Sequence, residues 1–262
     1  GYSPLCRSLF LQPPFFPLDV GTVAGRKIVV EQELTGGTGG RVWDCALGTV
    51  QFVSSRNFGK DWWVDKNVIE LGAGTGAVGL ACCMLGSNVV LTDIGPHVQL
   101  CRKNISHVMT ASSSSNPSKK RHRKGGHRSK GEGAAGSQPK PGRIVALEYD
   151  WAKETAPTPT STAEGVSENL SSKTEDTKEP DAKEPNAEAE FDVAIASDCV
   201  YKSDDKLLAQ ALAKVCGEKT LVIMTFGTRN SDRKHGEPMS AVSWGSRTGF
   251  FDEMKTRGFM MG

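Results

Sequence analysis

The chain has 262 residues, of which 37% are hydrophobic and 24% are charged, and its formal net charge is +2. A chain of this length can bury one substantial core, and so small a net charge neither favours nor excludes a nucleic-acid partner. The seven cysteines include no C-x-x-C pair and no matching histidine spacing, so neither a disulfide framework nor a metal site is predicted.

The cysteine usage is typical of a reduced, intracellular protein. No apolar run approaches the roughly 20 residues that span a bilayer, and the first residues lack the pattern of a secretion signal. We therefore expect a cytoplasmic protein with no membrane partner.

Two short segments open the chain. Residues 1–26 are rich in proline and aromatic side chains, which predicts an extended N-terminal arm. Residues 27–32 have the composition of a strand, and the glycines of residues 35–40 indicate a flexible turn. We expect one domain over residues 27–262 that begins with a single strand or a hairpin.

A helix is predicted next, because apolar residues at positions 42, 43, 46, 47, 50 and 53 follow a helical period. Trp43 lies at its start, where most tryptophans are core or rim residues. Since this helix leads into the strand and loop described next, we expect Trp43 to lie beside whatever that loop binds.

A strand, a glycine-rich turn and an apolar helix then follow without a break. Residues 67–71 read as a short buried strand, and residues 77–85 as the helix. The turn allows a ligand to press against bare backbone, so we predict a nucleotide-binding loop rather than a turn with no ligand. The turn glycines are Gly72, Gly74 and Gly76.

The glycine spacing alone leaves two ligands open. Gly74, Gly76 and Gly79 fit the G-x-G-x-x-G template, in which a pyrophosphate sits at a helix N-terminus, as in NAD-type oxidoreductases. Glu70 favours another ligand, because a carboxylate there repels a pyrophosphate but can face the cationic amino group of S-adenosylmethionine. The E-x-G-x-G-x-G form is typical of class I methyltransferases, so we predict S-adenosyl-L-methionine as cofactor.

A second carboxylate, Asp93, ends the next predicted strand, residues 89–92. An acid at the tip of the second strand of such a unit hydrogen-bonds the ribose hydroxyls. Alternatively, Asp93 only caps the helix predicted over residues 96–109. The two roles are compatible, and we favour ribose binding.

Two low-complexity insertions interrupt the domain. Residues 111–142 are basic and contain the run Lys119–Lys124, whereas residues 153–190 are net acidic. Neither segment can bury enough apolar surface to offset its ordering entropy, so both are predicted to be disordered. The basic run is expected to be solvated, with a nuclear-import signal or a nucleic-acid contact as the alternative.

The remaining elements complete an alternating pattern of strands and helices. Strands are expected over residues 143–149, 191–198 and 220–226, and helices over residues 204–216 and 244–257. This order predicts an α/β fold with a parallel sheet and right-handed crossovers, whose ligands bind beyond the carboxyl ends of the strands. The residues predicted at those ends are Glu70, Asp93, Asp150, Trp151, Asp198 and Tyr201.

Together these motifs resemble methyltransferase family 16, the seven-β-strand protein lysine methyltransferases. The motifs are Val42–Asp44, Glu70–Gly76, Leu91–Asp93, Asp150–Trp151 and Asp198–Tyr201. The resemblance covers about residues 27–110, 143–151 and 191–259. It implies a class I, Rossmann-like and mostly parallel sheet. The family closes this sheet with two further strands after the last predicted helix, so we expect the chain to lack them.

The resemblance also implies roles for the cofactor-binding residues. Trp43 resembles the residue beside the methionine moiety, and Glu70 with the glycine loop resembles its cradle. Asp93 is similar to the ribose-binding acid. Asp150 and Trp151 resemble the pair that hydrogen-bonds and stacks on adenine.

For catalysis, the resemblance implies transfer of a methyl group to a lysine side chain of a protein. Asp198 and Tyr201 match the substrate motif, in which Asp198 accepts a hydrogen bond from the lysine nitrogen and Tyr201 forms a wall of the channel. A chaperone, an ATPase or a translation factor is the implied substrate. We expect a monomer, with the nucleus as an additional location. A non-catalytic S-adenosylmethionine-binding module stays a third interpretation.

Overall fold

The computed structural model describes residues 15–33, 35, 37–114, 138–152, 155–160, 190–200, 205–227 and 248–260. Tyr201, the basic run Lys119–Lys124 and most of both predicted insertions lie outside these residues. The account below concerns the described residues.

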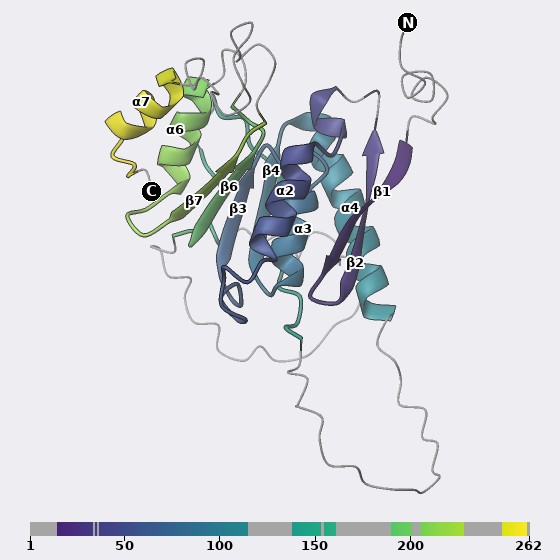
Figure 1. The fold of residues 1–262 in the computed structure, drawn as a ribbon. Coiled ribbons are helices and arrows are strands. Elements are labelled where there is room, and N and C mark those ends of the chain that lie inside the picture. Colours follow the sequence, from purple (N-terminus) through teal and green to yellow (C-terminus); the bar gives the residue numbers. More distant parts are fainter. Residues whose placement is uncertain are drawn as a thin grey trace, which may run out of the picture.

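A five-stranded sheet with the order β5-β4-β3-β6-β7 forms the centre of the fold, and every neighbouring pair is parallel (Figure 1). Its strands are β3 (Asn67–Leu71), β4 (Asn88–Asp93), β5 (Ile144–Glu148), β6 (Val193–Ser197) and β7 (Leu221–Thr225). Central strands of such sheets are apolar because helices cover both faces. The predicted α/β class with a mostly parallel sheet is confirmed.

Helices cover the sheet on both sides (Figure 1). Because successive side chains of a strand point to opposite faces, Val193 and Ile195 pack in one core and Ala194 and Ala196 in the other. The first core also contains side chains of α2 (Asp44–Val53), α3 (Ala77–Met84) and α4 (Gly95–Ser114). The second contains side chains of α6 (Asp205–Val215) and α7 (Thr248–Thr256).

An antiparallel hairpin precedes the sheet, formed by β1 (Phe15–Val23) and β2 (Arg26–Glu33). It packs against α3 and α4 and buries Val23, Ile28 and Val30 in the first core. The extended arm predicted over residues 1–26 is therefore a paired strand from Phe15 onward. The proline- and aromatic-rich composition of residues 1–26 does not indicate this pairing, which depends on contact with β2.

The described residues reach into the predicted basic insertion from both of its ends. Helix α4 continues to Ser114, past the expected start of the basic insertion at residue 111. The Ser112 hydroxyl donates to the Val108 carbonyl at 2.8 Å, which keeps this polar turn compatible with a helix. At the other end of the insertion, the Gly142 amide donates to the Cys83 carbonyl at 2.9 Å.

None of the helices in the described part of the chain is long and apolar enough to cross a membrane.

The far end of α2 is fixed by aromatic packing. Phe58 lies 4.8 Å from the Trp62 ring and 4.9 Å from the Trp63 ring, centroid to centroid. The buried Trp63 indole donates to the Val53 carbonyl at the end of α2, at 2.9 Å. These contacts join the end of α2 to the segment that leads into β3. The Thr49 hydroxyl of α2 lies 2.7 Å from that of Thr225 at the carboxyl end of β7, so α2 runs towards that edge of the sheet from its other end.

Candidate functional site

A cleft of about 480 Å³ opens at the carboxyl ends of β3, β4, β5 and β6, where parallel sheets bind their ligands. Its volume lies in the range of small-molecule sites. The cleft brings together most of the residues that the sequence predicted for the site. Those that line it are Trp43, Glu70, Gly72, Gly74, Asp93, Asp150, Trp151 and Asp198.

The loop after β3 has the left-handed backbone that favours glycine, with φ of 67° at Gly72 and 55° at Gly74. Space is also restricted at both positions. A Cβ at Gly74 would lie 2.7 Å from the carbonyl oxygen of Gly39, and one at Gly72 would lie 2.8 Å from the Cys199 sulfur. A side chain at Gly74 would therefore displace the segment around Gly39, and one at Gly72 would displace the end of β6.

Gly76, predicted to bind the cofactor, lies behind this loop and is not among the residues lining the cleft. Its amide donates to the Ala73 carbonyl at 2.8 Å, and a Cβ there would lie 2.8 Å from a Leu91 methyl. The glycine at this position thus lets the start of α3 pack closely on β4. Its contribution is to the shape of the loop.

Glu70 lies in the floor of the cleft and is only 2% exposed. Its Oε2 accepts a hydrogen bond from the Gly79 amide at 2.7 Å. Burial raises the pKa of Glu70 to about 8, against the opposing effect of the Gly79 hydrogen bond and with a smaller contribution from the charge of Asp93. A cation beside Glu70 would favour the charged carboxylate, whereas a pyrophosphate would be repelled by it.

Replacing Glu70 by Gln is expected to flatten the pH dependence of the free energy of unfolding. The pKa of Glu70 is about 8 in the folded state and 4.5 ordinarily, so between these values the folded protein keeps a proton that the unfolded chain has lost. The wild-type free energy of unfolding should therefore fall as the pH rises through this window, on the order of 1 kcal/mol per pH unit from this group. It should level off above the folded pKa.

Gln cannot titrate and keeps an oxygen for the Gly79 amide. Denaturant unfolding at a series of pH values measures the slope for both proteins. The exposed Glu218, changed to Gln, is the control and should leave the slope unchanged. Equal slopes in the wild type and the Glu70→Gln variant would contradict the burial of an uncharged Glu70.

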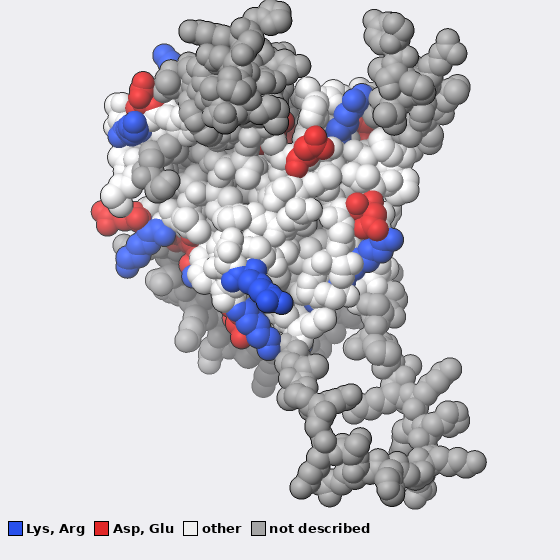
Figure 2. Space-filling view, viewed as in Figure 1, with Lys and Arg blue, Asp and Glu red and all other residues white. Residues whose placement is uncertain are grey.

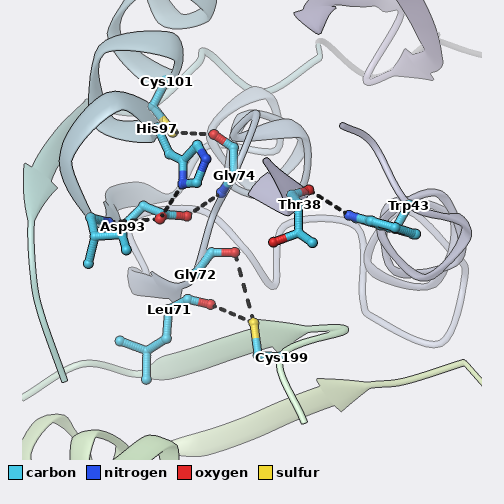
Figure 3. A network of polar contacts seen from close by, with 10 residues as sticks. Thr38, Trp43, Leu71, Gly72, Gly74, Asp93, His97, Cys101 and Cys199 are labelled. Atoms are coloured by element: carbon cyan, nitrogen blue, oxygen red, sulfur yellow. Dashed lines mark hydrogen bonds and ion pairs between the residues drawn. The ribbon is translucent and has the colours of Figure 1, made fainter. Parts of the chain in front are cut away.

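Asp93 is held by three protein contacts at the rim of the cleft (Figure 3). Its Oδ2 accepts from the Gly74 amide at 2.7 Å, and its Oδ1 accepts from the Ile94 amide at 2.7 Å. Oδ1 also lies 3.0 Å from His97 Nδ1. A carboxylate offers about four acceptor sites. The local contact at the start of α4 therefore coexists with a free acceptor position, and both roles predicted for Asp93 fit the geometry.

The adenine-binding residues predicted at the end of β5 also reach the cleft. Asp150 Oδ1 accepts from the Ala152 amide at 3.0 Å, which shapes the turn, and the Trp151 ring lies 3.4 Å from the position of a Gly72 Cβ. Sequence reasoning missed Tyr149, which lines the cleft and is 2% exposed. Within the described residues its hydroxyl has no hydrogen-bond partner, and burial raises its pKa.

Asp198 lines the cleft at the end of β6 with φ of 55°, a left-handed conformation that is uncommon outside glycine. Its amide donates to the Thr225 carbonyl at 2.7 Å, and the adjacent Cys199 thiol donates to the Leu71 carbonyl at 3.3 Å. Such strained positions cluster at functional sites. Tyr201 lies outside the described residues, so the predicted pair is placed only at Asp198.

The roof of the cleft, residues 38–43, consists of the short helix η1 (Thr38–Gly40) and the segment that leads into α2. Trp43 precedes α2, is 41% exposed, and its indole nitrogen donates to the Thr38 carbonyl at 2.9 Å (Figure 3). Trp43 lines the same cleft as the glycine loop, and its place beside a ligand stays a prediction. Arg41 of the roof and His97 of α4 also line the cleft and were not predicted, because no spacing rule relates them to the loop.

A parallel sheet with a glycine loop after β3 and acids at the neighbouring strand ends defines a nucleotide-cofactor-binding protein of the α/β class. The family model described as "Lysine methyltransferase" (Methyltransf_16) matches residues 23–119. The predicted resemblance to methyltransferase family 16 is thereby confirmed over this part of the chain. The matched part includes the roof, the glycine loop and Asp93.

Several relatives share this part of the sequence. The chain is 38% identical over 85 residues to the protein N-lysine methyltransferase METTL21A of Danio rerio, covering 32% of this chain and 38% of that protein. It is 38% identical over 69 residues to EEF1A lysine methyltransferase 3 of Mus musculus, covering 26% of this chain and 28% of that protein. The chain thus spans about a third of the length of these relatives.

Solved structures resemble the fold more distantly. The T. thermophilus 16S rRNA N2 G1207 methyltransferase, in complex with AdoMet and guanosine, aligns with a TM-score of 0.46 and 14% identity. The alignment covers 82% of this chain and 42% of that one.

Proposed function

We propose that this protein is an S-adenosylmethionine-dependent methyltransferase that modifies a lysine side chain of a protein substrate. The observation that carries the proposal is the convergence of Glu70, Asp93 and Asp198 on one cleft, around a loop whose backbone leaves no space for a side chain at Gly72 or Gly74. The family match over residues 23–119 supports the same activity.

The residues present fit the cofactor at each of its parts. In its charged form, which an adjacent cation favours, the buried Glu70 offers a negative charge to the cationic amino group. Asp93 keeps an acceptor position for a ribose hydroxyl. Trp151 presents a ring beside Gly72 for adenine, with Asp150 in the same turn. Trp43 lies on the roof, where we place the methionine moiety.

When bound, the cofactor supplies a methyl group on a positively charged sulfur. The lysine nitrogen would attack this methyl carbon with its lone pair as the carbon–sulfur bond breaks and a neutral thioether leaves. Its ammonium form, with a pKa of about 10.4, must therefore first lose a proton. We assign Asp198, at the end of β6, to accept a hydrogen bond from this nitrogen and orient its lone pair. Much of the rate enhancement would then come from holding the two reactants in line.

Calorimetric titration with S-adenosylmethionine and, separately, with NAD tests the cofactor. We expect binding of the first only, because the carboxylate of Glu70, which lines the cleft, would repel a pyrophosphate. Binding of NAD without binding of S-adenosylmethionine would favour the alternative, an oxidoreductase. Cofactor binding without methyl transfer to any protein of a cell lysate would favour the non-catalytic module.

A protein substrate fits the surface better than a nucleic acid does. On the face shown in Figure 2, the described Lys and Arg side chains are scattered among acidic ones around a broad uncharged area. Nucleic-acid-binding surfaces instead gather basic residues into a patch or stripe.

We propose a chaperone, an ATPase or a translation factor as substrate of a monomeric, cytoplasmic enzyme. Labelled cofactor added to a lysate, followed by identification of the labelled protein, would test this.

A further inference from the structure

We infer that Arg41 binds the carboxylate of the amino-acid end of the cofactor, opposite Glu70. The inference rests on the proposed function, because it assigns a residue to one part of that cofactor. The amino-acid end of S-adenosylmethionine carries both an ammonium and a carboxylate. A site that binds it therefore needs a negative group for the first and a hydrogen-bond donor for the second.

The cleft is lined by more acidic than basic side chains. Among the described residues that line it, Arg41 is the only lysine or arginine. The lining carboxylates are Glu70, Asp93, Asp150 and Asp198. A ligand carboxylate that enters without a cationic partner would be repelled by them and would lose its hydration. Arginine is the side chain best suited to bind it, because its planar guanidinium can donate two parallel hydrogen bonds.

Three backbone amides of the glycine loop are already used within the protein and do not compete for a ligand carboxylate. The Ala73 amide donates to the Thr92 carbonyl at 2.9 Å, and the Gly74 amide donates to Asp93 at 2.7 Å. The Gly76 amide donates to the Ala73 carbonyl. Glycine loops that bind anions do so with free amides at a helix start. The amides of Ala73, Gly74 and Gly76 are therefore not free for a ligand carboxylate, whereas the Arg41 side chain can donate to it.

The position of Arg41 matches this task. The preceding Gly39 lies against His97, on the side of Asp93, because a Cβ on Gly39 would lie 2.6 Å from the His97 ring. The following helix α2 leads to the side of β6, where the Thr49 hydroxyl lies 3.4 Å from that of Ser197. Arg41 thus stands on the roof between the acid placed at the ribose and the strand end placed at methyl transfer.

The backbone around Arg41 is fixed. The Val42 amide donates to Oε1 of the buried Gln32 of β2 at 2.8 Å, and the Trp43 indole donates to the Thr38 carbonyl. In the described part of the chain the exposed Arg41 guanidinium forms neither an ion pair nor a side-chain hydrogen bond. Its charge is therefore available to a ligand, and its backbone need not be reordered on binding.

Two ligands test the assignment on the full chain. S-adenosylhomocysteine contains the amino-acid end, whereas 5′-methylthioadenosine shares the nucleoside and sulfur but lacks both the ammonium and the carboxylate. We expect Arg41→Gln to weaken binding of the first by about ten- to hundredfold, the scale of a lost charge-assisted pair. Its affinity for the second should stay at the wild-type value. Arg41→Lys should recover part of the loss.

Arg56→Gln is the matched control, since Arg56 is an exposed arginine beyond the end of α2 and outside the cleft. It should change neither affinity. Equal weakening of both ligands by Arg41→Gln would show a structural role for Arg41 and overturn the inference. Unchanged binding of S-adenosylhomocysteine would overturn it as well. Failure of the wild type to bind either ligand would instead refute the proposed cofactor, and the inference with it.

Discussion

Replacing Asp198 by Asn is expected to reduce the rate of methyl transfer by about a hundredfold or more, the scale of losing one positioned polar group. Asn tolerates the left-handed backbone that Asp198 adopts, with φ of 55°, so the end of β6 should keep its shape. The amide removes the negative acceptor assigned to the lysine nitrogen. Cofactor affinity should change little, because Glu70, Asp93 and the glycines are untouched.

The rate is measured as labelled methyl transferred to lysate proteins, and the affinity by calorimetry with S-adenosylhomocysteine. Asp65 provides a matched control, because it too is a left-handed aspartate, with φ of 60°, but it precedes β3 outside the cleft. Asp65→Asn should leave both quantities unchanged. If Asp198→Asn lost cofactor binding in step with activity, Asp198 would be a cofactor or structural residue, and the assignment to the lysine would be withdrawn.

The second large effect is expected for Asp93→Ala, which should weaken S-adenosylmethionine binding by about a hundredfold, or roughly 2.7 kcal/mol. The change removes the acceptor for the ribose. It also leaves the Gly74 amide, now donating at 2.7 Å, without its carboxylate, so the glycine loop loses a constraint. Calorimetry measures the affinity, and thermal unfolding shows whether the variant is folded.

Asp192→Ala is the control that separates loss of the ribose acceptor from loss of a carboxylate that holds the backbone. Asp192 also holds two partners, the Asn67 amide at 2.8 Å and Lys66 Nζ at 3.0 Å, but it lies at the other end of the sheet. Its loss should lower the free energy of unfolding with no change in cofactor affinity. Wild-type affinity in a folded Asp93→Ala variant would exclude the ribose role.

The parallel sheet could be predicted because its strands are local features of the sequence. Residues 193–196 form an apolar run that only a strand covered on both faces explains, and they are all buried. The hairpin was only partly predicted, because β1 contains Pro17. The burial of the hairpin also depends on the packing of β1 and β2 on α3 and of β2 on α4. Such tertiary packing leaves little trace in local composition.

The site was predictable where a spacing rule fixes backbone geometry. Glu70, Gly72 and Gly74 follow from the loop pattern, and each lines the cleft. Arg41 and His97 reach the same cleft from a roof segment and from α4, so their proximity depends on how separate elements pack. The same limit explains Gly76, whose spacing fits the motif although its neighbours are Leu91 and Cys101 rather than the cleft.

The hydrogen bond between Gln32 of β2 and the Val42 amide has a consequence for kinetics. It joins the roof of the cleft to a hairpin that lies outside the central sheet. Small peripheral elements open locally more often than a central sheet does, and opening of the hairpin that breaks this bond would release its hold on the roof. We therefore expect the residence time of a bound cofactor to depend on how often the N-terminal hairpin opens, although the hairpin contains none of the residues assigned to the ligand.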